Sequence, residues 1–179
     1  MVIAYLDFIW ALVALLYDLG KLASISWFLW PLVVICPLFP FLLGLVFLEI
    51  TKKSRPNQFL LASAGIASAT FGALALLFYP LIMFNEGFSW AGFGQILWVL
   101  FYGLQGWYLV YKYKVGLGPI LVAGIYLIGK LTLDYFYLSF GYLAVEKLTA
   151  GQLLGLYVAG LAVVVVVCLI AGRTGATDP

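Results

Sequence analysis

The sequence has 179 residues, contains no histidine, and has only 9% charged residues. The missing histidine excludes haem with an imidazole ligand, histidine-bound zinc or copper, and a histidine general base. Soluble domains average about a quarter charged residues, so the small charged fraction argues against a soluble domain. The formal net charge of +2 is too small to indicate a nucleic-acid partner.

Cysteine is scarce as well, because the only two, Cys36 and Cys168, lie in apolar segments far apart in the sequence. We expect them to be small core hydrophobes and not a disulfide or a metal pair. The sequence has no phosphate-binding loop, nucleophile elbow, paired acidic motif or CxxC. We therefore expect no catalytic residues, no cofactor and no metal. Enzyme activity on a lipid or a quinone is a third-ranked alternative.

Hydrophobic residues make up 66% of the chain. Small domains leave much of their surface exposed, so a chain of this length cannot bury that excess and lipid must solvate most of its outside. About 20 apolar residues in a helix cross the ~30 Å hydrocarbon core of a bilayer. Backbone groups in lipid must bond internally, which favours helices over open strands. Six segments satisfy these conditions: Val2–Leu19, Trp27–Glu49, Gln58–Phe84, Trp90–Tyr111, Gly118–Leu143 and Gly151–Ala171.

The sequence therefore predicts an all-α polytopic transmembrane helix bundle with six spans, in a single domain over residues 1–179. The count becomes five if Val2–Leu19, which is short and contains Asp7, lies at the membrane interface. Proline kinks helices, and three prolines lie within residues 22–49. We expect an irregular, re-entrant stretch around Ser24–Pro37, followed by a regular helix.

Cationic residues predict the orientation of the six spans. With alternating helices, one side of the membrane collects most of them: Lys52, Lys53, Arg55, Lys112, Lys114 and Arg173. The other side has only Lys21 and Lys147, and Lys130 lies inside a span. The positive-inside rule makes the richer side cytoplasmic. The prediction is a protein integral to the cell membrane, with both termini in the cytoplasm.

Two of the predicted helices carry stripes of small residues, which allow helix backbones to approach closely in lipid. One stripe contains Gly65, Ala69 and Gly72, and the other contains Gly151, Gly155 and Ala159. Each stripe either packs within the chain or docks another subunit. Sequence spacing does not separate these two alternatives.

Lys130 and Asp134 form the most informative pair, because they lie four residues apart near the middle of the fifth span and so share one helix face. A charge at the bilayer centre costs at least ~2.5 kcal/mol on insertion scales, so it usually faces the bundle interior and has a partner. The pair is either a polar site on an ion pathway or an internal ion pair that holds the packing. The other candidate members of an intramembrane polar site are Asp7, Gln95, Gln105 and Tyr135.

The segment Trp27–Pro40, with its Cys-Pro-Leu sequence entering a hydrophobic helix, and the later Asp134-Tyr135 dipeptide are similar to motifs of one family. The chain resembles the uncharacterised prokaryotic membrane proteins called domain of unknown function fourteen-zero-five. It departs from their pattern at Ile35, where an acid is expected, and in its missing late-helix histidine. The resemblance implies no activity. Because some members are encoded beside respiratory cytochrome genes, it implies an accessory role.

Two functions are consistent with these observations. The first is a non-catalytic subunit or assembly protein of a larger membrane complex, surrounded by lipid and bound to other subunits or to its own copies. The second is a small ion or solute carrier or channel with Lys130 and Asp134 at the midplane. The short loops favour the first function and the charge pair favours the second.

Overall fold

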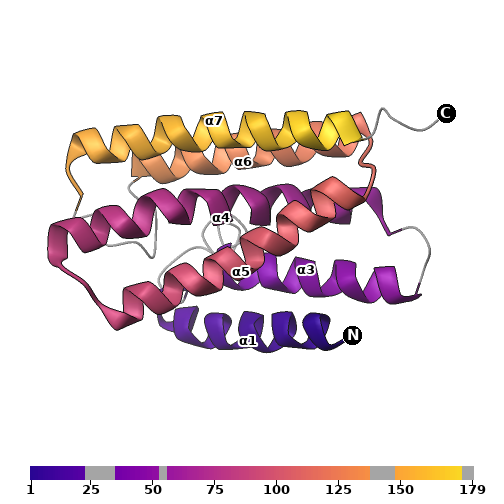
Figure 1. The fold of residues 1–179 in the computed structure, drawn as a ribbon, viewed down its shortest axis with the longest axis horizontal. Helices are drawn as coiled ribbons and strands as arrows, with labels where there is room; N and C mark the ends of the chain where they lie inside the picture. The colour runs from indigo at the N-terminus through magenta and orange to yellow at the C-terminus, as the bar shows by residue number, and fades with distance from the viewer. Residues whose placement is uncertain (23–34, 53–55, 138–147, 175–179) are drawn as a thin grey trace.

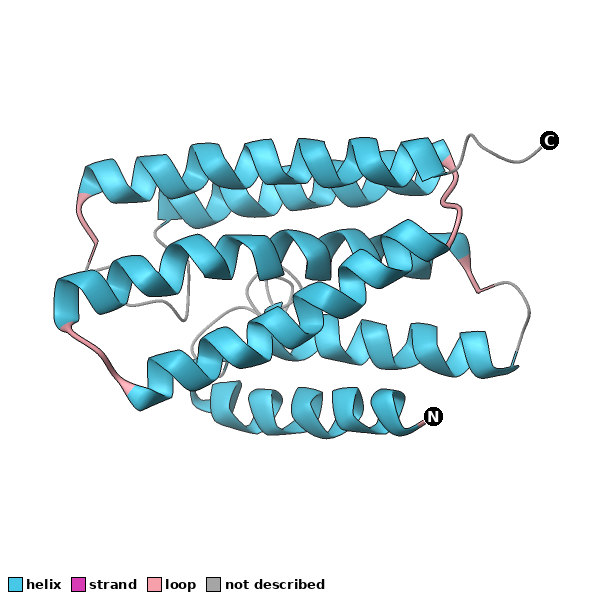
Figure 2. Ribbon diagram, viewed as in Figure 1, coloured by secondary structure: helices cyan, strands magenta, loops and turns pink. Residues whose placement is uncertain are grey.

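The computed structural model describes residues 1–22, 35–52, 56–137 and 148–174, and within these ranges it is all-helical (Figure 2). The expected all-α class is therefore confirmed for the described part of the chain. The helices are α1 (Val2–Leu22), α3 (Ile35–Lys52), α4 (Gln58–Glu86), α5 (Trp90–Lys112), α6 (Leu117–Tyr137) and α7 (Ala150–Thr174).

Helix α4 is the centre of the bundle, because it packs against α3, α5, α6 and α7 (Figure 1). Helices α6 and α7 pair on one side of α4, and α1 pairs with α3 on the other side. The N-terminus and the end of α7 lie at the same end of the bundle. Most of the buried apolar residues form one cluster along α4, with contributions from α3, α5, α6 and α7.

Capping residues mark the start of α4 and the connection from α4 to α5. Asn57 caps α4, since its Oδ1 accepts hydrogen bonds from the backbone N–H groups of Phe59 and Leu60 at 2.9 and 3.2 Å. Gly87 ends the same helix at a φ of +91°, a backbone region that favours glycine. Ser89 then caps α5 by accepting from the N–H of Gly92 at 2.9 Å.

A capping box begins α7 and also ties it to α4. The backbone N–H of Thr149 donates to Gln152 Oε1 at 2.9 Å, and the N–H of Gln152 donates back to Thr149 Oγ1 at 3.3 Å. The same Gln152 Oε1 accepts from Asn85 Nδ2 at 3.1 Å. The end of α4 and the start of α7 are therefore held together by side chains 67 residues apart.

The count of six spans is not confirmed by the described helices. Three segments are long and apolar enough to cross a membrane: Gln58–Glu86, Leu117–Phe136 and Ala150–Arg173. The apolar segment Val2–Leu16 is shorter. Helix α5 is rich in tryptophan, tyrosine and glutamine, which lower its hydropathy. Composition alone therefore supports three spans.

The region with three prolines is described only in part. Helix α3 begins at Ile35, so Cys36 and Pro37 are already helical although the sequence predicted irregular backbone up to Pro37. The rest of the predicted re-entrant stretch, residues 24–34, lies outside the described residues. Pro40 is within α3 and Pro80 within α4.

Candidate functional site

Lys130 and Asp134 form an ion pair within α6, and both side chains are almost fully buried, with exposures of 1% and 3%. The four-residue spacing places both groups on one face of the helix, as the sequence predicted. This face is directed into the bundle. The neighbouring Leu131 packs against α7, where its Cδ1 atom would lie 3.2 Å from a Cβ atom built on Gly160. The pair compensates two charges within one helix, which lowers the cost of placing them away from water.

Tyr135 belongs to a contact between α6 and α7. Its ring stacks on Tyr157 of α7 with centroids 4.7 Å apart and an interplanar angle of 18°. The Tyr157 hydroxyl lies 3.1 Å from Thr132 Oγ1, which also donates to the carbonyl of Ile128 at 2.8 Å. These contacts assign Tyr135 a packing position next to the ion pair.

Asp7 and Gln105 form a second buried polar centre, between α1 and α5. Gln105 Nε2 donates to Asp7 Oδ1 at 3.2 Å, and the exposures of Asp7 and Gln105 are 0% and 8%. The second carboxylate oxygen, Asp7 Oδ2, and the amide oxygen, Gln105 Oε1, have no hydrogen-bond partner among the described residues. The buried Tyr102 hydroxyl, three residues before Gln105 on the same face of α5, has none either.

The structure thus divides the predicted polar site into two centres on opposite sides of α4. Sequence reasoning suggested that Gln95 and Gln105 serve the charge pair on α6, but Gln105 bonds Asp7 and Gln95 is exposed. Helix α6 packs on α4 and α7, whereas α1 packs on α3.

Two buried hydroxyls on α4, Ser68 and Thr70, have no partner in the described part of the chain. The sequence had no signal for Thr70.

Aromatic rings accompany the second centre. Trp10 of α1 stacks on Trp98 of α5 with centroids 4.3 Å apart at 15°, and Trp98 stacks on Tyr102 at 6.1 Å and 18°. Trp10 and Trp98 lie about one to two turns from Asp7 and Gln105 along their helices. The stack and the Asp7–Gln105 bond together join α1 to α5. The importance of Trp10 was not predicted from the sequence.

The two small-residue stripes differ in what they pack against. The stripe of Gly65, Ala69 and Gly72 packs within the chain: a Cβ atom built on Gly106 of α5 would lie 2.7 Å from the Gly65 carbonyl oxygen. By contrast, a Cβ atom built on Gly151 or Gly155 would meet nothing within 4 Å among the described residues. Tertiary structure thus resolves the alternative for α4 and leaves the stripe on α7 open.

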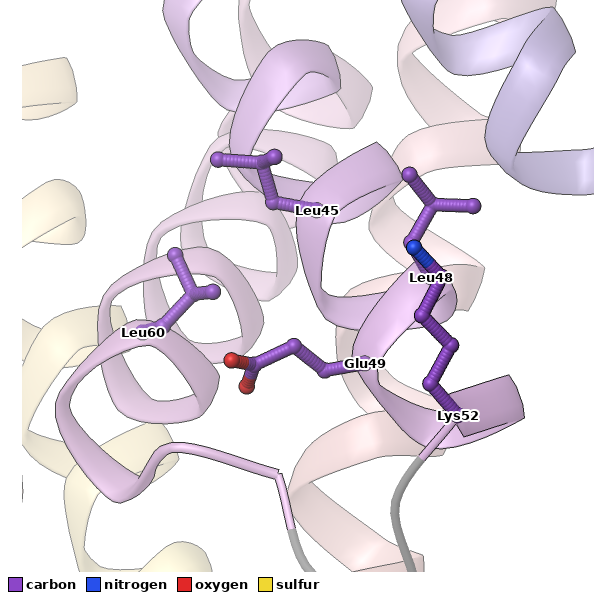
Figure 3. Close-up of a pocket in the computed structure, with 5 residues that line it drawn as sticks. All are labelled: Leu45, Leu48, Glu49, Lys52 and Leu60. Atoms are coloured by element: carbon purple, nitrogen blue, oxygen red, sulfur yellow. The ribbon is translucent and has the colours of Figure 1, made fainter.

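An open groove lies between the end of α3 and the start of α4 (Figure 3). Its lining is mostly leucine, with one acid and one base: Leu45, Leu48, Glu49, Lys52 and Leu60. The carboxylate of Glu49 accepts a hydrogen bond from the backbone N–H of Asn57 at 2.7 Å. This hydrogen bond links the last turns of α3 to the residue that caps α4.

Within the described residues no group of histidine, cysteine, aspartate and glutamate side chains could hold a metal ion. Cys168 is a free, partly buried thiol next to Gly124, and the side chain of Cys36 lies outside the described part of the structure. Comparisons with protein-family models, with curated proteins and with solved structures found no match. The resemblance of Trp27–Pro40 and Asp134-Tyr135 to the uncharacterised membrane family therefore stays a prediction.

Proposed function

We propose that this chain is a non-catalytic, membrane-embedded subunit or assembly protein, bound to other membrane proteins through the exposed face of α7. The observation that carries the proposal is the contrast between the two stripes. The stripe of α4 packs against α5, whereas Gly151 and Gly155 of α7 contact no described residue that would fill the space of a side chain. Small residues on an open helix face allow a second helix to approach closely in lipid.

The rest of this α7 face is apolar and free of charge. Leu154, Val158, Val165 and Leu169 are 49–59% exposed. Only 22% of the spanning segment of α7 is buried, against 44% of the α4 segment. A transmembrane helix with so little burial contacts lipid or another protein along most of its length. The exposed glycines of the stripe, Gly151 and Gly155, favour contact with another protein.

In this proposal the six described helices span the cell membrane, with both termini in the cytoplasm. The cationic residues Lys52, Lys112 and Arg173 lie in the last turns of α3, α5 and α7, and these three helices end on the same side of the bundle (Figure 1). Lys112 donates to the Tyr108 hydroxyl and lies over the Tyr113 ring, an arrangement typical of a membrane interface. The sequence resemblance makes a respiratory complex the first assembly to test.

The test is purification of the tagged chain from native membranes in a mild detergent, with mass spectrometry of the proteins retained in stoichiometric amounts. The informative variant is Gly155→Leu, which fills the open stripe. The matched control is Gly129→Leu on α6, since Gly129 is also exposed and has nothing within 4 Å of a built Cβ atom among the described residues.

We expect a defined set of partners that Gly155→Leu loses and Gly129→Leu retains, while both variants keep the thermal stability of the wild type. Purification of the wild type alone, or retention of all partners by Gly155→Leu, would contradict the proposal. A homo-oligomer that Gly155→Leu dissociates would assign the same face to self-association and exclude a hetero-complex.

The second candidate is a small ion or solute carrier or channel, and it rests on the burial of Lys130 and Asp134 inside the bundle. Intramembrane charges often mark ion pathways. If the chain is a carrier or channel, the purified protein in liposomes should conduct an ion or solute. The double variant without the charges of Lys130 and Asp134 should then be folded and inactive. The subunit predicts no flux from the purified chain.

A further inference from the structure

The Asp7–Gln105 contact leaves two facing groups incomplete. Gln105 Nε2 donates to Asp7 Oδ1, while Asp7 Oδ2 and Gln105 Oε1 are buried and have no partner among the described residues. An ionised carboxylate only accepts hydrogen bonds, and so does an amide oxygen. These two atoms therefore cannot satisfy each other as long as Asp7 is ionised, and each buried acceptor without a donor costs free energy.

One proton removes both deficits. A protonated carboxyl has one O–H donor and one carbonyl acceptor, which match the acceptor and donor of a primary amide. With the proton on Oδ2, the Oδ2–H bond to Gln105 Oε1 would close a ring alongside the existing Nε2–H bond to Oδ1. The terminal torsions of both side chains are soft, so a small rotation brings the two planar groups edge to edge.

We propose that Asp7 and Gln105 form a proton-binding site inside the bundle, in which a protonated Asp7 carboxyl and the Gln105 amide make two reciprocal hydrogen bonds. The site goes beyond the proposed subunit function and does not depend on it. Its ligand is a proton, which Asp7 takes up or releases while Gln105 holds the carboxyl between α1 and α5.

The groups around Asp7 support a neutral carboxyl. Helix α3 presents Phe41 and Gly44 against the neighbouring Phe8, and its charged residues Glu49 and Lys52 lie more than a turn beyond Gly44. Helix α5 presents the Tyr102 hydroxyl, the group within electrostatic range of Asp7. Among the side chains that the structure describes, no lysine or arginine forms an ion pair with Asp7. A carboxylate here would be an isolated buried charge, which is strongly unfavourable.

Lys130 is the buried cation of the described bundle, and it pairs with Asp134 on the far side of α4. It is therefore not available to compensate an ionised Asp7. The stacked rings of Trp10, Trp98 and Tyr102 lie beside the site along α1 and α5. Their position ties the proton site to the side-chain contact between α1 and α5.

The first measurement is infrared difference spectroscopy of the purified chain as a function of pH. We expect the carbonyl stretch of a protonated carboxylic acid at neutral pH, shifted in heavy water and lost completely in Asp7→Asn. Gln105→Leu should keep the band and move it, because the carboxyl loses its amide partner. Absence of such a band in the wild type, or its persistence in Asp7→Asn, would overturn the proposal.

Thermal unfolding gives an independent readout. The amide introduced by Asp7→Asn would make the same two bonds to Gln105 without a titrating proton, so this variant should melt within about 2 °C of the wild type at neutral pH. The wild type should lose stability as rising pH removes the proton, and Asp7→Asn should not. Asp7→Leu, which makes neither bond, should melt lower than Asp7→Asn.

The dependence of the melting temperature on sodium distinguishes a proton at the Asp7–Gln105 site from a bound metal cation. Asp7 Oδ2, Gln105 Oε1 and the Tyr102 hydroxyl are oxygen atoms, which a small cation could also bind. We expect the wild-type melting temperature at neutral pH to be the same in sodium and choline chloride. A rise in sodium that Asp7→Asn lacks would overturn the proton site in favour of a cation site.

Discussion

Gly103 of α5 lies against Gly72 of α4, so that a Cβ atom built on Gly103 would be 2.7 Å from the Gly72 Cα atom. The two helices therefore touch backbone to backbone at their crossing (Figure 1). Because the obstructing atoms belong to the backbone, neither helix can accept a side chain here without moving.

Gly103→Ala should destabilise the bundle by about 1–3 kcal/mol, the usual cost of overpacking a close contact. The matched control is Gly94→Ala on the same helix, because a Cβ atom there would meet nothing within 4 Å in the described structure. The control should be neutral or slightly stabilising, since alanine favours helix over glycine. Thermal unfolding in detergent compares the two, and equal melting temperatures would contradict the backbone contact.

Removing one member of the Lys130–Asp134 pair should be more harmful than removing both. Either Lys130→Ala or Asp134→Ala removes one partner of a buried ion pair and should cost roughly 3–5 kcal/mol. The double variant should recover part of that loss. A double-mutant cycle of unfolding free energies measures the coupling, and additive effects would show that the two charges do not stabilise each other.

Gln152→Leu should loosen the junction between α4 and α7. The substitution removes the bonds that Gln152 Oε1 accepts from Thr149 and Asn85, which lie near the surface. We expect a loss of about 1 kcal/mol, typical of a helix cap. Asn85→Ala removes only the link between the helices and should cost less. Hydrogen exchange at the start of α7 should rise more in Gln152→Leu, and equal protection in both variants would argue against the capping box.

Cysteine labelling tests the proposed orientation. In a chain with Cys36 and Cys168 replaced by alanine, Lys114→Cys should react with a membrane-impermeant reagent only after the cells are opened. Phe88→Cys, whose native side chain is 63% exposed between α4 and α5, should react in intact cells. The opposite pattern would reverse the orientation, and labelling of both sites from outside would contradict a span by α5.

Most of the helices are predictable because their signal is local. Long apolar segments in lipid must bond their own backbones, so the segments around α4, α5 and α7 were predicted to within about three residues at each end. The Lys130–Asp134 pair was predictable for the same reason, since four-residue spacing fixes a shared face within one helix. The break between the segments that end at Phe84 and begin at Trp90 was predicted as well.

The partners of the polar residues were decided by tertiary structure. Asp7 bonds Gln105, 98 residues away, and Gln105 does not join Lys130 because α4 lies between the two centres. Likewise, the small-residue stripes of α4 and α7 look alike in sequence. Only the crossing of α5 over α4 buries the stripe of α4 within the chain. Helix periodicity determines which face carries a residue, but the packing of all the helices determines what that face meets.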